Sequence, residues 1–312
     1  MKVLMILAIA AVILAAAAAS EIYREVHTFA VTRYNATSPR LKGLRKGTRV
    51  LFLSDLHNCI YGSHNERLLQ TIREEKPDLI LIGGDMLVGK PNEPFDTALE
   101  FVSQLPSICP VYYANGNHEG RMKEDTDKYG DAYTDYRKAL EKYGVIFLEN
   151  AIEYLNLNGQ QLAVCGLEFP VYTYKKFHRS HIEKRDVADH LSHFHTSNDM
   201  AAESPGKVPD QYTILLAHNP AYMDAYLDWG ADLILSGHLH GGLVRIPGLG
   251  GIVTPQGFFF PKYSGEMTRV GEQTVIVSRG LGSHTLNIRL FNVPELISIR
   301  LIPAEENSCK DL

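Results

Sequence analysis

The chain has 312 residues, of which 45% are hydrophobic and 21% charged, the composition of an ordinary globular protein. With residues 1–20 set aside, this length fits one large α/β domain or two small ones. The formal net charge is only −5 and the basic residues are scattered, so no nucleic-acid partner is expected. The four cysteines form no C-x-x-C pair, which argues against a zinc knuckle or a redox motif.

The chain opens on an apolar segment. Residues 3–19 carry no charged or polar side chain, and these 17 residues lie at the lower limit for a membrane-spanning helix, which needs about 17–25. The small residues before Ser20 also provide an A-x-A cleavage site. Residues 1–20 are therefore predicted to be either a transmembrane anchor, which is slightly favoured, or a signal peptide. Basic residues flank both ends, so the orientation is weakly determined, and we expect the bulk of this membrane-anchored or exported protein outside the cytoplasmic membrane.

Residues 21–47 are predicted to form a strand, at 25–34, and a basic connection, at 39–47. The main domain is predicted to span residues 48–303. It begins with three apolar runs that indicate buried strands, separated by segments with helical periodicity. The predicted strands are residues 50–53, 79–82 and 111–113, and the predicted helices are residues 65–75 and 97–105. This alternation of strand and helix is typical of a largely parallel sheet.

The second half of the domain begins with a polar segment, residues 172–210, that is predicted to be an inserted helical lobe and a linker. A substrate lid is one role for it. Three of its histidines, His190, His193 and His195, lack a carboxylate or cysteine at a matching spacing, so a solvated helix face is favoured over a metal site. Further strands are predicted at residues 213–216, 233–235, 275–277 and 296–301, and residues 304–312 are predicted to be a tail.

Polar residues with metal-ligand chemistry follow five of the predicted strands. They are Asp55, His57, Asp85, Asn117, His118, His218, His238 and His240. Because ligands gather beyond the carboxyl ends of parallel strands, we expect these side chains at one edge of the fold. Taken singly the motifs are weak, since Asp55 is explained by a turn and Asp85 by a helix N-cap. Together they indicate a pair of divalent transition metals, an arrangement that hydrolyses phosphate esters.

The set D-x-H, G-G-D, G-N-H-E, H and G-H-x-H resembles the calcineurin-like metallophosphoesterase superfamily over residues 50–301. The apolar N-terminus, the D-L-H-N form of the first motif, and the stretches at residues 257–265 and 278–282 resemble its membrane-associated bacterial branch. The resemblance implies an α/β fold, a four-layer α/β/β/α sandwich with a small polar insertion and an N-terminal apolar helix. Its site would lie between loops at one edge.

The resemblance also implies roles for the eight residues. One metal would be held by Asp55, His57 and His240, and the other by Asn117, His218 and His238, with Asp85 bridging the two. A hydroxide that bridges the metals would attack phosphorus, so no phosphoenzyme intermediate is expected. His118 would protonate the leaving oxygen and needs a partner to fix its tautomer, for which Glu119 is only a guess.

The residues after Asp85 depart from one branch of the superfamily. The protein Ser/Thr phosphatases carry a V-D-R-G type stretch there, whereas this chain has M-L-V-G, which argues against a phosphoprotein phosphatase. Ligands without thiolate suit Mn²⁺, which we favour, with Zn²⁺ and Fe as alternatives. Substrate-binding residues are not identified by this pattern.

Three hypotheses for function remain open at this stage. The first is a membrane-attached phosphoesterase for diesters or pyrophosphates, with a lipid-linked ester such as UDP-2,3-diacylglucosamine as its most specific form. That substrate requires a site facing the cytoplasm, against the orientation expected above. The aromatic residues within 257–263 either pack in the core or form an apolar wall for such a lipid. The second is a non-catalytic, metal-stabilised scaffold that binds phosphate, and the third is a secreted phosphomonoesterase.

Overall fold

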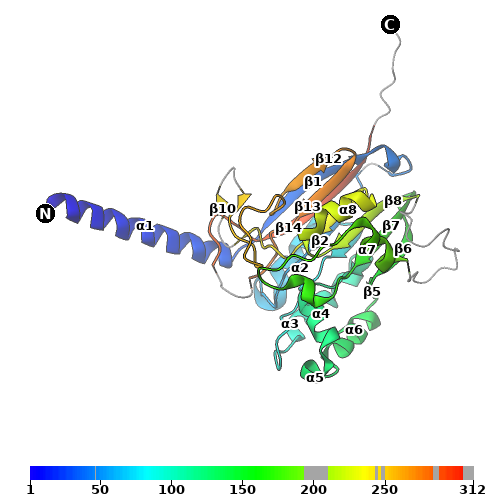
Figure 1. Ribbon diagram of the computed structural model, residues 1–312, viewed down its shortest axis with the longest axis horizontal. Coiled ribbons are helices and arrows are strands. Elements are labelled where there is room, and N and C mark those ends of the chain that lie inside the picture. Colours follow the sequence, from blue (N-terminus) through cyan, green and yellow to red (C-terminus); the bar gives the residue numbers. More distant parts are fainter. Residues whose placement is uncertain (46, 193–209, 243–244, 247–249, 284–287, 305–312) are drawn as a thin grey trace, which may run out of the picture.

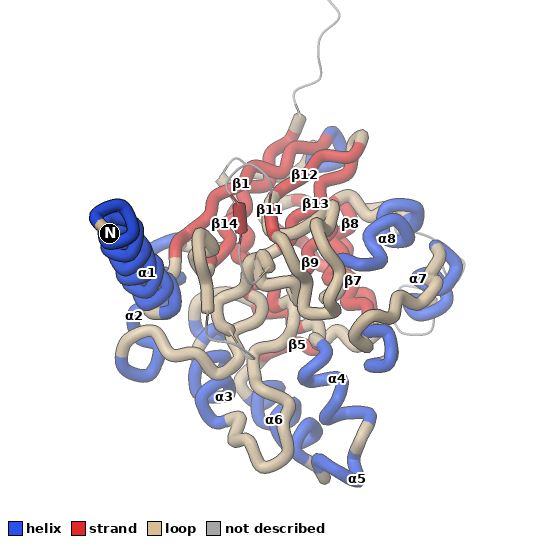
Figure 2. The backbone as a smooth tube through the Cα atoms, turned by 60° about the vertical axis from the view of Figure 1, so that its left-hand side comes forward, coloured by secondary structure: helices blue, strands red, loops and turns tan. Residues whose placement is uncertain are grey.

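The computed structural model describes every residue except 46, 193–209, 243–244, 247–249, 284–287 and 305–312. In the described part, two six-stranded sheets lie face to face, and helices cover the outer face of each (Figures 1 and 2). A two-stranded hairpin, β10 (Arg245–Ile246) with β11 (Gly250–Gly251), stands apart from both sheets.

The first sheet has the strand order β1-β14-β2-β3-β4-β5. Its strands are β1 (Ala30–Ser38), β14 (Glu295–Pro303), β2 (Arg49–Leu53), β3 (Leu79–Ile82), β4 (Val111–Tyr113) and β5 (Val145–Phe147). β2 to β5 run parallel, β14 is antiparallel to β2, and β1 is parallel to β14. The apolar runs of β2, β3 and β4 are thus the parallel strands that the sequence predicts, and their carboxyl ends meet at one edge.

The second sheet has the strand order β12-β13-β9-β8-β7-β6. Its strands are β12 (Met267–Val270), β13 (Gln273–Val277), β9 (Leu233–Ser236), β8 (Tyr212–Ala217), β7 (Gln160–Leu167) and β6 (Ala151–Leu157). The four central strands, β13, β9, β8 and β7, run parallel, and the two edge strands are antiparallel to their neighbours. β8, β9 and β13 confirm predicted strands, whereas β6, β7 and β12 have no counterpart in the prediction.

Helices form the two outer layers. The first sheet carries α2 (Glu66–Glu75), α3 (Asp96–Val102), α4 (Asn117–Glu124), α5 (Thr126–Tyr129) and α6 (Ala132–Lys142). The second carries α7 (Lys184–Leu191) and α8 (Met223–Trp229). Single turns of 3-10 helix lie at Pro39–Leu41, Ser63–Asn65, Leu105–Ser107, Val171–Tyr174 and Pro220–Tyr222. Figure 2 shows the strands between these two groups of helices.

The side chains of each inner strand alternate between two apolar cores. In β2, Val50 and Phe52 point into the core between the sheets, whereas Leu51 and Leu53 pack against the helices outside. A third core lies between the second sheet and its helices and contains Trp229 of α8. Strands buried on both faces must be apolar at every position, which is why these runs are continuous in the sequence. The α/β/β/α order of layers follows from these three cores.

The N-terminal helix α1 (Lys2–Val26) projects away from the body in Figure 1. It is the one helix in the described residues that is long and apolar enough to cross a membrane. The strand predicted for residues 25–34 exists as β1, but its predicted bounds were wrong. β1 spans Ala30–Ser38, because the N-terminal helix continues past residue 20 to Val26.

The polar segment 172–210 contributes α7 to the outer layer of the second sheet. Val187 and Leu191 of α7 are buried in the core that contains Trp229. His190 lies on α7, whereas His193 and His195 fall outside the described residues. The prediction that this segment forms an inserted lobe that covers substrate therefore stays a prediction.

Candidate metal centre

The eight predicted site residues all follow the carboxyl end of a strand. Asp55 and His57 come after β2, Asp85 after β3, Asn117 and His118 after β4, His218 after β8, and His238 and His240 after β9. The first sheet therefore supplies five of these residues and the second sheet three, across one edge of the sandwich. All of them are buried except His240, which is partly exposed.

The carboxylates and imidazoles form three overlapping groups whose candidate ligand atoms lie within 4.8 Å of one another. The groups are Asp55 with His57 and His240, His57 with Asp85 and His118, and Asp85 with His218 and His238. Asp85 links them, since its Oδ2 lies 3.1 Å from His218 Nε2 and 3.9 Å from His57 Nε2. The Asp85 carboxylate therefore lies between the group that contains His57 and the group that contains His218.

The backbone is left-handed at five of the eight residues. Positive φ angles occur at Asp55 (54°), His57 (47°), Asp85 (55°), His238 (68°) and His240 (50°). Such angles are uncommon for residues other than glycine and cluster at functional sites. Here they bend each loop sharply after its strand, so that side chains two positions apart, such as His238 and His240, face the same centre.

Backbone carbonyls fix the orientation of two imidazoles. His218 Nδ1 lies 2.6 Å from the carbonyl oxygen of Gly83, and His240 Nδ1 lies 3.0 Å from that of Gly282. A carbonyl can only accept, so Nδ1 donates in both rings and the lone pair is left on Nε2. Metal-binding histidines in proteins usually have this outer partner.

His118 has the opposite arrangement. The backbone N–H of Gly89 donates to His118 Nδ1 at 2.8 Å, so Nδ1 accepts and the ring proton is on Nε2. That Nε2 lies 4.0 Å from Asp85 Oδ2, at the same centre. His118 thus presents an N–H to the place where the other imidazoles present lone pairs.

Glu119, the guessed partner of His118, has a different role in the structure. Its buried carboxylate accepts hydrogen bonds from the backbone N–H groups of Asp85, Met86 and Gly116 and from the hydroxyl of Tyr113. It therefore ties the loop after β3 to the start of α4. Burial and the nearby Asp85 carboxylate raise the pKa of Glu119 to about 7.

Several buried polar atoms near the centre make no hydrogen bond within the described residues. Among them are three atoms of predicted ligands, namely the amide oxygen Oδ1 of Asn117 and the ring nitrogens Nε2 of His218 and His238. Asn117 lies between Gly116 and His118, which both adjoin Asp85. A buried acceptor without a donor costs free energy that a bound cation would recover. The chemistry of this donor set fits divalent cations.

The charges at the centre also favour a cation. Burial alone would raise the pKa of Asp85, but the neighbouring imidazoles, His218 first, hold it well below the usual range. In return, Asp85 raises the pKa of His218 to about 10 against the effect of burial. Because Nδ1 of His218 donates to the carbonyl of Gly83, a cation bound at Nε2 would take the place of the second proton.

Comparison with known proteins identifies the family. Residues 48–242, well over half of the chain, match the family model of the calcineurin-like phosphoesterases. The chain belongs to this family. It is 25% identical over 283 residues to the uncharacterized protein YpbG of Bacillus subtilis, and the match covers 90% of this chain and 88% of YpbG. It is 24% identical over 260 residues to phosphodiesterase YaeI of Escherichia coli, and the match covers 81% of this chain and 82% of YaeI.

Similar solved structures include the phosphopantetheinyl hydrolase PptH of Mycobacterium tuberculosis. That protein is 15% identical with a TM-score of 0.44, and the match covers 75% of this chain and 89% of PptH. Membership of the calcineurin-like phosphoesterases makes the chain a metallophosphoesterase that uses divalent metals.

Sequence reasoning missed residues that border the centre of this calcineurin-like phosphoesterase. A cavity of about 160 Å³ beside Asn117 is lined by Asn115, Lys123, Glu168 and Tyr174 among others. The Lys123 ammonium lies 2.7 Å from Glu168, whose other oxygen accepts from the amide of Asn115. These residues come from separate segments and share no motif. The sequence signal for them was only that Asn115 and Lys123 flank the G-N-H-E motif.

Proposed function

We propose that this calcineurin-like phosphoesterase hydrolyses phosphodiester or pyrophosphate bonds at a centre that holds two divalent cations. The observation that carries the proposal is the opposite orientation of similar imidazoles at one centre. His218 and His240 present lone pairs, as ligands do, whereas His118 presents an N–H, as a proton donor does.

The ligands divide between the two cations as follows. Asp55, His57 and His240 would hold one cation, and His218 and His238 together with Asn117 would hold the other, with Asp85 within reach of both groups. Bound cations supply an activated water molecule and neutralise the charge of the phosphoryl group. Carboxylate, amide and imidazole donors suit Mn²⁺, which we favour, with Zn²⁺ and Fe as alternatives.

His118 donates its Nε2 proton to the oxygen of the leaving group. The N–H of Gly89 holds the proton on Nε2, and the fold of α4 places the ring against Asp85. Neither a serine nor a cysteine is required as nucleophile in this scheme, so phosphate is not transferred to the protein.

For the substrate, a diester or pyrophosphate is the first candidate, and a lipid-linked one of the UDP-2,3-diacylglucosamine type is the second. A cavity of about 400 Å³ favours the second, since Leu239, which lies between His238 and His240, lines it together with the side chains of Phe258 and Phe259. An acyl chain could lie along this aromatic wall. That substrate requires a site facing the cytoplasm. We place the catalytic domain on the outer side of the cytoplasmic membrane, and on that side cell-envelope polymers and nucleotides are the corresponding substrates.

The test compares bis(p-nitrophenyl) phosphate with p-nitrophenyl phosphate, using the full chain in detergent with added Mn²⁺. We expect the diester to be cleaved faster, and we expect His118→Ala to lower turnover by about 10²–10⁴-fold, as loss of a general acid does. Asp85→Asn should abolish turnover while the protein stays folded. The matched control is His64→Ala, at an exposed histidine that pairs with Glu100.

Metal content separates the proposal from a non-catalytic scaffold. His118→Ala protein should keep two metal ions per chain by elemental analysis, because its Nε2 is not a ligand. Full activity of either His118→Ala or Asp85→Asn would refute the assignment. If metal-loaded wild-type protein cleaves neither the two nitrophenyl esters nor a pyrophosphate, the scaffold hypothesis takes the place of the enzyme.

A further inference from the structure

The length of α1 limits how far the body can stand from a membrane that holds the helix. The apolar run ends at residue 19, and α1 continues without a break to Val26. Residues 20–25 therefore add about 9 Å at 1.5 Å per residue. At that point the helix is attached to the body, since buried Glu25 accepts a hydrogen bond from the N–H of Asn292 at 2.9 Å.

Large apolar side chains are exposed around the C-terminal end of α1. Ile60, which is 55% exposed, lines a cavity together with Val26 and His27 at the end of α1. Phe291, which is 57% exposed, precedes the residue that binds Glu25. Both residues thus lie beside the end of α1.

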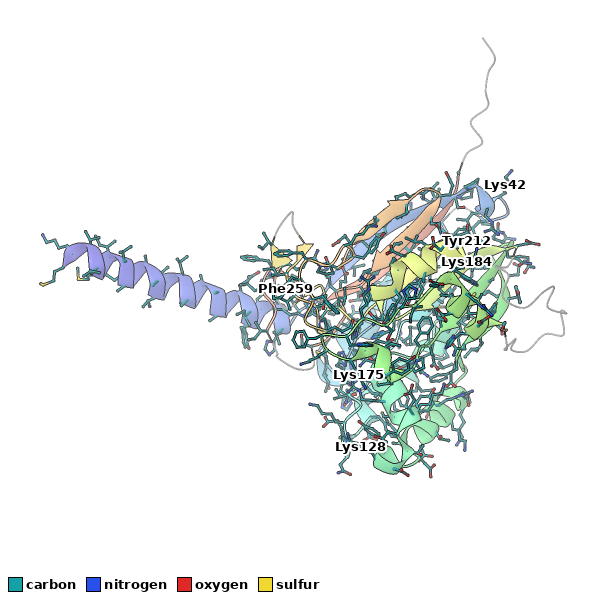
Figure 3. The ribbon with its side chains drawn as sticks, in the orientation of Figure 1. Lys42, Lys128, Lys175, Lys184, Tyr212 and Phe259 are labelled. Carbon is teal, nitrogen blue, oxygen red and sulfur yellow. The ribbon has the colours of Figure 1, made fainter. Side chains whose placement is uncertain are left out.

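The aromatic loop at residues 258–260 continues this face. Phe259 and Phe260 are 69% and 61% exposed, so the core-packing interpretation fails for these two side chains. Figure 3 places Phe259 on the side of the body from which α1 leaves. The side-chain amide of Asn292 donates to the carbonyl of Gly242, which adjoins residues 251–253, and the N–H of Phe260 donates to the carbonyl of Ile252.

We propose that this face, formed by Ile60, Phe259, Phe260 and Phe291, docks on the surface of a lipid bilayer. Exposed aromatic and aliphatic side chains of this kind enter the headgroup region of a membrane, and aromatic residues are enriched there. The continuous helix α1 brings them within reach without unfolding any element. Lys262, which follows the two phenylalanines and is exposed, meets the phosphate groups of the lipids.

This docking differs from anchoring by α1 and does not depend on the proposed phosphoesterase reaction. It predicts that the body lies against the bilayer, with the aromatic loop in the headgroup region. If these residues instead form a binding site for a protein partner, they would stay outside the lipid, and that result would overturn the proposal.

The experiment uses the full chain in phosphatidylcholine–phosphatidylglycerol vesicles that contain a brominated lipid. The only tryptophan, Trp229, is buried in the core and gives a constant background. Phe259→Trp and, separately, Phe260→Trp add a reporter at exposed aromatic positions. The control is Tyr143→Trp, since Tyr143 is 61% exposed and follows α6, on a part of the body remote from α1 in Figure 1.

We expect the emission added at positions 259 and 260 to fall by about half, as for a ring about 5–10 Å into the headgroup boundary, while emission from position 143 is unchanged. Two tryptophan variants are used so that the test still works if one of them does not fold. Quenching at both positions that does not exceed that of Tyr143→Trp would overturn the proposal, whatever the activity of the enzyme.

Discussion

At the scale of single residues, the backbone gives chemically identical side chains opposite hydrogen-bonding orientations. His218 faces a carbonyl oxygen and keeps a lone pair on Nε2, whereas His118 faces the N–H of Gly89 and keeps a proton there. The residue types alone could not separate these roles, because the sequence does not reveal which backbone group meets Nδ1. The resemblance implies different roles for the two residues, and the two hydrogen bonds would give that difference a physical cause.

Gly89→Ala tests the contact that orients His118. A Cβ at this position would lie 2.4 Å from the carbonyl oxygen of His118, so the segment must move and the hydrogen bond to Nδ1 is weakened. We expect turnover to fall by at least about tenfold, which corresponds to about 1.4 kcal/mol of transition-state stabilisation. Steady-state kinetics and metal analysis provide the measurement. Unchanged metal content with reduced kcat supports the contact, and unchanged kcat contradicts it.

At the scale of elements, the strands buried on both faces were predictable and the less apolar segments were not. β2, β3, β8 and β9 are continuous apolar runs because they have a core on each side. The hairpin of β6 and β7 was missed although it turns at Asn158-Gly159, both with positive φ, a pair that is typical of a two-residue turn. α4 is strongly polar and starts directly at the site residues, so it offered no apolar period.

A charged cluster joins one helix to three strands of the first sheet. Glu75 ends α2 and accepts hydrogen bonds from Arg33 of β1, Arg49 of β2 and Ser298 of β14. Burial alone would raise the pKa of Glu75, but these donors and the arginine charges outweigh it and hold the pKa below its ordinary value. Ionised Glu75 therefore stabilises the fold at neutral pH.

Glu75→Gln should lower the free energy of unfolding at pH 7 by about 1–2 kcal/mol, since a charged acceptor is lost. Because the pKa in the folded state is the lower one, the contribution is complete above the unfolded value of about 4.3 and disappears as the pH falls through the folded value. Urea titrations at pH 7 and at acidic pH measure this difference. The control is Glu74→Gln at the exposed neighbouring position, and an equal loss at both pH values would contradict the account.

At the scale of the whole molecule, the centre lies where the two sheets meet. Asp55 and Asp85 lie in loops of the first sheet and Asn117 begins the helix that follows β4, whereas His218 and His238 lie in loops of the second sheet. Cations bound by both sets would connect the two halves of the sandwich directly. Metal binding should therefore stabilise the whole fold and not a single loop.

Mn²⁺ should raise the midpoint of thermal unfolding of the chelator-treated full chain. At a free concentration of 100 times its Kd, one bound ion adds about 2.7 kcal/mol to the free energy of unfolding. Calorimetry with and without Mn²⁺ measures the shift. His218→Ala should lose much of it, whereas His181→Ala, at an exposed histidine, should keep it. A midpoint that does not respond to the metal would exclude a cation that connects the sheets.

The hydrogen bonds of Asn292 have a consequence for how the enzyme would meet its substrate. Its backbone N–H donates to Glu25 of α1 and its side-chain amide donates to the carbonyl of His240, so one residue connects the N-terminal helix to the loop of a candidate ligand. If α1 anchors the chain in a membrane, the catalytic centre would keep a constant height above the lipid as the protein diffuses. Its turnover would depend on the number of substrate molecules per unit area of membrane, and dilution of the surrounding solution would leave it unchanged.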